Sequence, residues 1–163
     1  MTPGWKLWFA GAAGLLLAET AFAQNAISAR AGMINVAEGD VFFSDSRSAA
    51  PQRVEPKPNE ILSMKEGQIL RTEEGRAEVL LTPGAFLRMG ESSAMQLHSN
   101  RLSSVKIELL EGSALIDVVE LLSDNSVIVR LGEAEAELEK AGLYRFDAAP
   151  PRVAAILHRA IAA

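Results

Sequence analysis

Hydrophobic and polar residues alternate with a period of two through most of the chain after residue 61. The runs are short, and they cover residues 76–81, 86–89, 105–110, 126–131, 134–138 and 143–146. Glycine-containing turn signals separate them at intervals of about 8 to 12 residues, which is typical of all-β domains. No alternation of strands and helices is present, which argues against a parallel α/β sheet. We therefore predict an all-β fold, an antiparallel sandwich or roll of about ten or more short strands.

Two turns can be predicted in more detail. Thr82-Pro83-Gly84-Ala85 follows one alternating run and precedes another. Pro presets φ at the second turn position and Gly accepts φ > 0 at the third, so this segment predicts a type II turn and a hairpin. Nearer the N-terminus, Glu38-Gly39-Asp40 separates two apolar runs, residues 33–36 and 41–43, and has the composition of a turn.

The first 23 residues have the pattern of a secretory signal. One Lys precedes the 11-residue apolar run at 7–17, and Ala21-Phe22-Ala23 offers the small-x-small pattern of a cleavage site. We expect an N-terminal signal helix, cleavage after Ala23 and a periplasmic or secreted location. The alternative is a retained membrane anchor, although the run is short of the roughly 20 residues that span a bilayer.

The remaining segments lack the period of two. Residues 24–31 are a short lead-in, and residues 44–60 contain three of the seven prolines and predict an exposed loop within the domain. Residues 148–163 form a tail with apolar side chains at helical spacing, namely Val153, Ile156, Leu157 and Ile161. We predict a short C-terminal helix after Pro150-Pro151. It would either cover an edge of the domain's own sheet or dock a partner.

Composition narrows the function. The chain has 163 residues, a formal net charge of −5 and no Cys. That length fits one domain, and the acidity argues against binding nucleic acid, which calls for basic stripes. The lack of Cys excludes disulfides, thiol catalysis and Cys-based metal sites.

Two sets of residues are candidates for metal chemistry. Glu133, Glu135, Glu137 and Glu139 share one face of a predicted strand. Neighbours on a strand face stand about 7 Å apart, so we interpret the row as a solvated face rather than a Ca²⁺ site. His98 and His158 are the only histidines. Because a zinc site needs three or four ligands, we expect His98 to face a loop and His158 to lie on the polar side of the tail.

Other chemistry has little support. The pair Gly112-Ser113 sits in an ordinary turn signal rather than a Gly-x-Ser-x-Gly elbow, and no phosphate-binding loop is present. Phe42-Phe43 could expose one ring for stacking on a sugar, whereas we expect Phe86 and Phe146 in the core. We predict no catalytic residue, no cofactor and no metal site.

An ordered set of motifs resembles the FecR-like domain, whose pattern is Gly, an apolar strand, Thr, a Gly turn, an alternating strand, a Gly turn and a third strand. The matching stretches are Gly67–Thr72, Gly75–Leu81, Pro83-Gly84, Phe86–Arg88 and Ser93. Residues 105–117 and 127–146 look like the remainder, so the resemblance covers residues 32–147. It implies an all-β extracytoplasmic domain.

In signalling members of that family, such a domain follows a membrane helix and a cytoplasmic anti-sigma segment and receives a signal from an outer-membrane transporter. Other members are stand-alone exported proteins. Only six residues precede the apolar segment here, so we expect no anti-sigma activity.

The sequence therefore predicts an exported, non-enzymatic domain that binds another envelope or outer-membrane protein through sheet edges and inter-strand loops, with residues 44–60 the most exposed candidate. Two alternatives remain open. One is an envelope scaffold that binds polysaccharide or peptidoglycan, and the other is an enzyme.

Overall fold

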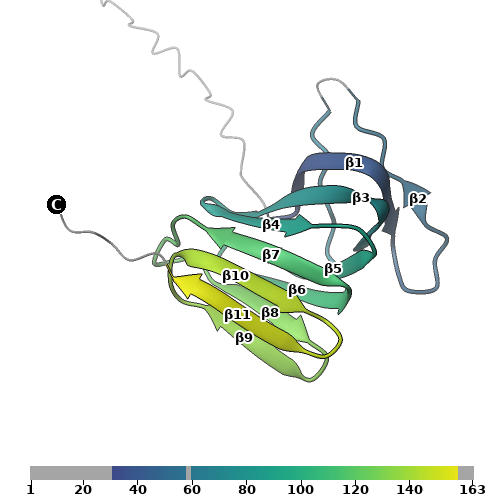
Figure 1. Ribbon diagram of the computed structural model, residues 1–163. Coiled ribbons are helices and arrows are strands. Elements are labelled where there is room, and N and C mark those ends of the chain that lie inside the picture. Colours follow the sequence, from purple (N-terminus) through teal and green to yellow (C-terminus); the bar gives the residue numbers. More distant parts are fainter. Residues whose placement is uncertain (1–30, 58–59, 158–163) are drawn as a thin grey trace, which may run out of the picture.

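A computed structural model describes residues 31–57 and 60–157, and in that part every regular element is a β-strand. The predicted signal, most of the lead-in, His158 and Ile161 lie outside the described residues. The eleven strands belong to one curled sheet (Figure 1). Their bounds are β1 Met33–Ser44, β2 Gln52–Arg53, β3 Ile69–Thr82, β4 Ala85–Met89, β5 Ser93–Arg101, β6 Ser104–Glu111, β7 Ser113–Val118, β8 Val127–Leu131, β9 Ala134–Leu138, β10 Gly142–Asp147 and β11 Arg152–Leu157. The all-β prediction is confirmed.

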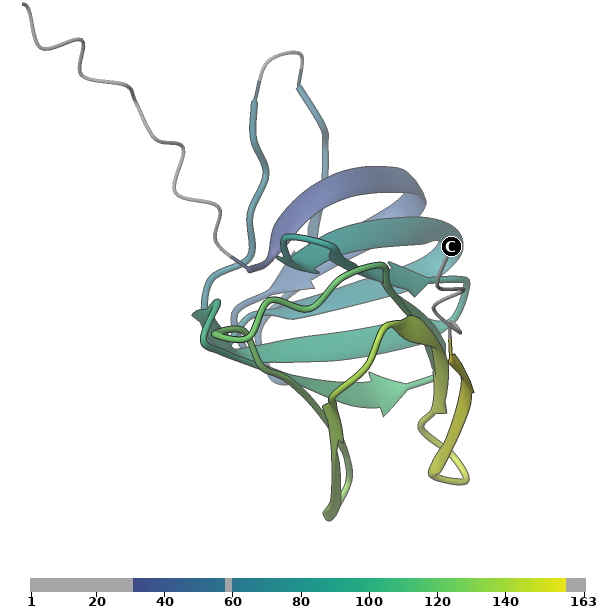
Figure 2. The same cartoon turned by 90° about the vertical axis from the view of Figure 1, so that its left-hand side faces the viewer.

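The long strand β3 joins two halves of the sheet. One of its edges pairs with β1, and the other pairs first with β5 and then with β4. From β4 the sheet continues through β7 and β10 to β11, and from β5 it continues through β6 and β8 to β9. We call these the β4 half and the β5 half. Figure 2 shows that they curve toward each other around a common interior and stay open between β9 and β11.

The pairing departs from a purely antiparallel sheet at one place. Strands β6 and β8 are parallel, whereas the other strand pairs among the described residues are antiparallel. The reason is the connection from β7 to β8, which crosses from the β4 half to the β5 half through residues 119–126 instead of turning back beside β7.

A pair of glycines allows β1 and β3 to follow this curvature. Gly39 lies opposite Gly75, and a β-bulge follows between Gly39 and Val41. A Cβ added at Gly75 would lie 2.5 Å from the carbonyl oxygen of Glu38, and Gly39 has φ +75. The predicted turn at 38–40 and the Gly75 turn of the FecR-like pattern are therefore wrong. Both glycines bend continuous strands of 12 and 14 residues.

Side chains from alternate positions of the strands fill the space between the two halves. Successive side chains of a strand point to opposite faces, so every second residue enters the interior. The largest fully buried side chains are Phe146, Leu70, Leu81, Leu87, Met89, Met95, Leu97, Ile107 and Ile116. Burial of each such side chain favours folding by about 1.5–3 kcal/mol. The expectation for Phe146 is confirmed. That for Phe86 is wrong, because Phe86 alternates with buried Ala85 and Leu87 and lies half-buried on the outer face.

The helix predicted for the tail is wrong for residues 152–157. These residues form β11, which pairs along its whole length with β10. The turn at 148–151 returns the chain beside β10, where six residues gain ladder partners. A helix this short would be marginal, and Val153 and Ile156 are β-branched residues that favour strands.

Candidate functional site

The outer face of the β5 half carries a network of charged side chains. Glu108 on β6 lies at its centre, 2.9 Å from His98 Nε2, 3.3 Å from Arg47 and 3.8 Å from Arg130. Within residues 31–57 and 60–157, the His98 ring hydrogen-bonds to Glu108 and to no hydroxyl group. His98 thus lies on a sheet face rather than toward a loop, and its neighbours form an ion-pair cluster without an adjacent nucleophile.

The predicted glutamate row lies along β9 and the residues that flank it, and all four side chains are exposed. Glu135 binds Lys106 Nζ at 2.9 Å and lies 3.5 Å from Arg130 Nε, while Glu137 accepts a hydrogen bond from Ser126 Oγ at 2.6 Å. The hydrogen bond from Lys106 lowers the pKa of Glu135. Two of the four carboxylates therefore have protein partners, and the described residues contain no group of three or more His, Asp or Glu placed to hold a metal ion.

The 44–60 loop is largely exposed in its described part, although Gln52–Arg53 pair with β1 as β2 and Val54 is buried. Beside it lies a groove of about 520 Å³ between the loop and β6. Four charged side chains line it, and they form two ion pairs, Arg47–Glu108 and Arg71–Glu111. The hydrogen bond from Arg71 lowers the pKa of Glu111. Because these charges are paired, the groove offers no unmatched charge to a ligand.

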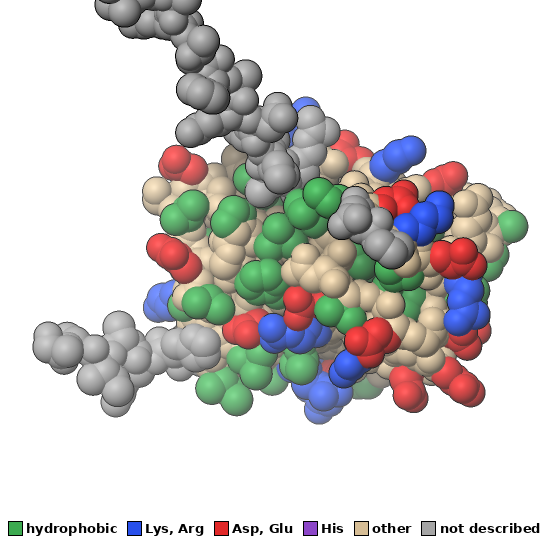
Figure 3. Space-filling model, turned by 90° about the horizontal axis from the view of Figure 1, so that it is seen from above, with side chains coloured by type: hydrophobic (Ala, Val, Ile, Leu, Met, Phe, Trp, Pro, Cys, Tyr) green, Lys and Arg blue, Asp and Glu red, His purple; other side chains and the backbone are tan. Residues whose placement is uncertain are grey.

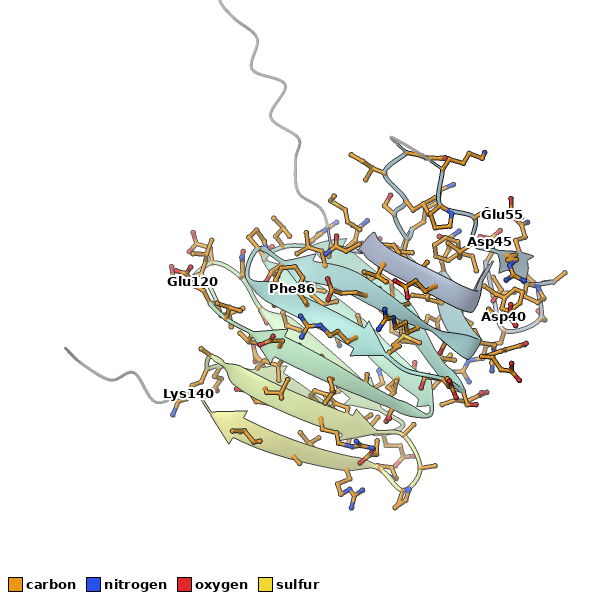
Figure 4. All side chains as sticks on the ribbon, turned by 45° about the horizontal axis from the view of Figure 1, so that its top comes forward. Asp40, Asp45, Glu55, Phe86, Glu120 and Lys140 are labelled. Atoms are coloured by element: carbon orange, nitrogen blue, oxygen red, sulfur yellow. The ribbon has the colours of Figure 1, made fainter. Side chains whose placement is uncertain are left out.

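The outer face of the β4 half is different, because apolar side chains form a line across its strands. The strand register brings them together with one acidic residue, in the order Leu80, Phe86, Asp117, Leu143 and Ile156. Leu80, Phe86 and Leu143 are half-buried, and Ile156 is 70% exposed. Leu115 lies in the adjacent row and is 37% exposed. We call Leu80, Phe86, Leu115, Leu143 and Ile156 the apolar patch; Figure 4 shows Phe86 on the near side of the sheet.

One arginine organises the polar residues within this patch. Arg88 Nε donates to Glu78 Oε2 at 2.8 Å, and Arg88 Nη1 donates to Asp117 Oδ2 at 3.0 Å. The three residues come from β3, β4 and β7, so the network fastens three strands together. The hydrogen bond from Arg88 lowers the pKa of Glu78, and the same two carboxylates raise the pKa of Arg88. Because these charged groups pair with one another, the apolar side chains of the patch are the groups available for contact with a partner.

Charge is distributed unevenly over the rest of the surface. Seen from above, hydrophobic side chains gather toward the left and centre, and acidic and basic side chains crowd the right-hand end (Figure 3). Figure 4 places Asp40, Asp45 and Glu55 at that end, near β2 and the 44–60 loop. The loop end is therefore the more hydrophilic end of the molecule.

The apolar patch ends at a strand edge that is open in the described part of the chain. Strand β11 pairs with β10 on one side only, and Figure 1 draws it in yellow beyond β10 at the end of the β4 half. Such an edge presents unpaired N–H and C=O groups that can bind a further strand. Of its residues 152–156, only Arg152 is charged, and all five are exposed.

Sequence reasoning missed this site. The period of two identified β3, β4, β7 and β10, but it could not tell which strands are neighbours, so the line of apolar residues was not visible. The only sequence feature that pointed to this site is the apolar content of residues 153–157, and its spacing is also typical of one face of a helix.

Comparison with known proteins adds no relative. No protein-family model matches the chain, and no match was found among curated proteins or solved structures. No helix in the described residues is long and apolar enough to cross a membrane. The structure defines the chain as an all-β protein with a curled, mixed sheet. One outer face carries an ion-pair network, and the other carries the apolar patch beside the network of Glu78, Arg88 and Asp117.

Proposed function

We propose that the chain is an exported, non-enzymatic protein-interaction domain whose binding site is the apolar patch together with the edge of β11. The observation that carries the proposal is the continuity of the two features. Ile156, the most exposed large hydrophobic side chain of the described residues, lies on the open edge and is opposite Leu143 of the patch. A strand added to β11 would gain main-chain hydrogen bonds and place apolar side chains on the same face.

The sequence supports the envelope as the location. The signal pattern at residues 1–23 favours export, and the resemblance to FecR-like domains favours a protein partner in the envelope. The partner class we propose is another envelope or outer-membrane protein. Export makes one prediction of its own: the intact mass of the protein recovered from cells expressing the full chain should correspond to a start at Gln24. A mass that retains Met1 would contradict cleavage and would favour the membrane anchor.

The binding site can be tested in cells that produce the full chain. A photo-reactive amino acid at position 156 or 115 should form adducts with protein, because these positions lie in the proposed contact surface. Leu122 is a matched control, since it is 48% exposed but lies in the loop between β7 and β8. Adducts at 156 and 115 with few at 122 would support the proposal. Equal labelling at all three positions, or none at 156 and 115, would overturn it.

A further inference from the structure

The two end strands of the sheet, β9 and β11, differ in a way that indicates what β11 can pair with. Strand β9, at one end, carries Glu135 and Glu137 on one face. Strand β11, at the other end, has Ala154 and Ala155 at its middle and the exposed side chains of Val153 and Ile156 on either side. Charged side chains on an edge discourage pairing with another strand, and their absence permits it.

We propose that β11 pairs antiparallel with β11 of a second copy of this chain, with a two-fold axis beside Ala154 or Ala155. The inference rests on the proposed function, since it names a second copy as the occupant of that edge and leaves the apolar patch to the envelope partner. Two identical strands that continue one sheet are related by an axis perpendicular to it, and this operation keeps each side chain on its own face. Paired residues must therefore have numbers whose sum is even.

Neither of these two registers sets like charges opposite each other. With the axis at Ala154, Val153 lies opposite Ala155 of the second copy and Arg152 lies opposite Ile156. With the axis at Ala155, Ala154 lies opposite Ile156. Small side chains stand at the axis in either case, and the one charged residue, Arg152, is bound to Asp147 of its own chain at 3.0 Å. No like charges face each other.

The same rule disfavours self-pairing of β9. A two-fold axis at Ala136 would set Glu135 directly opposite Glu137 of the second copy, and like charges in directly opposed positions destabilise a sheet. Of the two end strands, only β11 then favours pairing with itself, so this contact closes as a dimer. The apolar patches of both copies would lie on the same face of the joined sheet.

Sedimentation of the protein purified from cells expressing the full chain tests self-pairing. The protein should be a dimer in the micromolar range. Ile156→Lys should weaken the dimer at least about tenfold, because the new charge would face Arg152 of the second copy in one register and Ala154 in the other. Val119→Lys is the matched control, since Val119 is 63% exposed and lies outside the strands. It should leave the dimer unchanged.

Single-cysteine variants locate the contact, because the chain has no Cys of its own. Ala154→Cys and Ala155→Cys should give a disulfide-linked dimer at one of these two positions, since directly opposed Cβ atoms stand about 4.5–5.5 Å apart. Ala134→Cys, an exposed alanine on β9, should link poorly.

Three outcomes would overturn self-pairing: a monomer throughout the micromolar range, a dimer insensitive to Ile156→Lys, or links that form equally well at position 134. If self-pairing fails but position 156 labels a different protein in cells, the proposed function stands with another occupant. If position 156 labels no protein at all, both proposals fall.

Discussion

Arg88 pairs with the two carboxylates that lie next to the apolar patch. Its guanidinium group binds Glu78 and Asp117, which lie on the strands at either side of β4. The side chain of Arg88 is 45% exposed, so solvent screens these interactions. The network stabilises the packing of three strands modestly, and it neutralises charge where a partner is proposed to bind.

Arg88→Met should therefore lower the free energy of unfolding by at most about 1 kcal/mol at pH 7, because two neighbouring carboxylates lose their common partner. The cost should be smaller at pH 3, because Glu78 loses its charge as the pH falls through its lowered pKa. Urea unfolding at the two pH values measures the difference. Arg101→Met, at an exposed arginine outside this network, is the control. An equal cost at both pH values would contradict the electrostatic role of Arg88.

At the scale of the element, the bend in β1 and β3 allows this antiparallel strand pair to serve both halves of the sheet. Gly39 and Gly75 face each other at the bend, where the backbones approach too closely for side chains. Next to them, Glu38 binds Arg76 at 2.7 Å across the two strands. The bend positions β4 and β5 on the same edge of β3 and so determines which strands can form the apolar face.

Gly75→Ala should destabilise the protein by about 1–3 kcal/mol, the usual cost of overpacking. Its Cβ would lie 2.5 Å from a carbonyl oxygen and 2.8 Å from the backbone nitrogen of Asp40. Gly90→Ala is the matched control, since nothing lies within 4 Å of an added Cβ there and its φ is not positive. Thermal unfolding of both variants checks the prediction. If the two variants have the same melting temperature, the close approach of the backbones at the bend does not explain why glycine is needed at position 75.

The sequence was informative about local structure. The hairpin at 76–89 is confirmed, with Gly84 at φ +85 in the turn between β3 and β4. Residues 152–157 show the limit of local reasoning. Ala residues and apolar spacing favour a helix there, yet pairing with β10 across the turn at 148–151 decides the outcome, and β10 is itself paired with β7.

The folding stability of the whole molecule depends in part on ionised carboxylates on both of its outer faces. The pKa values of Glu78, Glu111, Glu135 and Asp147 are all lowered, in each case chiefly by a hydrogen bond from a basic side chain: Arg88, Arg71, Lys106 and Arg145. A carboxyl group whose pKa is lower in the folded state binds protons more tightly in the unfolded state. Its contribution to stability is therefore present above the unfolded pKa and is lost as the pH falls through the folded pKa.

Stability should accordingly be highest near neutral pH and fall as the pH drops below about 4.5, the ordinary value for Glu. Added salt should reduce the difference, because these pairs are partly exposed and screened. Unfolding by urea as a function of pH measures the effect. The variant Glu78→Gln with Glu111→Gln should lose part of the pH dependence, and a profile identical to that of the unsubstituted protein would contradict the assignment.

The candidate site could be predicted only in general terms. Sheet edges were a reasonable expectation for an all-β domain, but the choice of β11 over β9 required the strand order. The apolar patch required the register, since Phe86 and Leu143 belong to strands with β7 between them. The pattern along the chain shows which residues share a face of one strand, and it does not show which strands are neighbours.

The central claim is that the edge of β11 is a binding site, whoever its partner. Amide hydrogen–deuterium exchange, read strand by strand, tests it most directly by comparing the protein in an envelope fraction with dilute purified protein. The account predicts slower exchange in β11 within the envelope fraction and no change in β9, where the edge carries glutamates. Equal exchange of β11 in both samples, or new protection confined to β9, would contradict it.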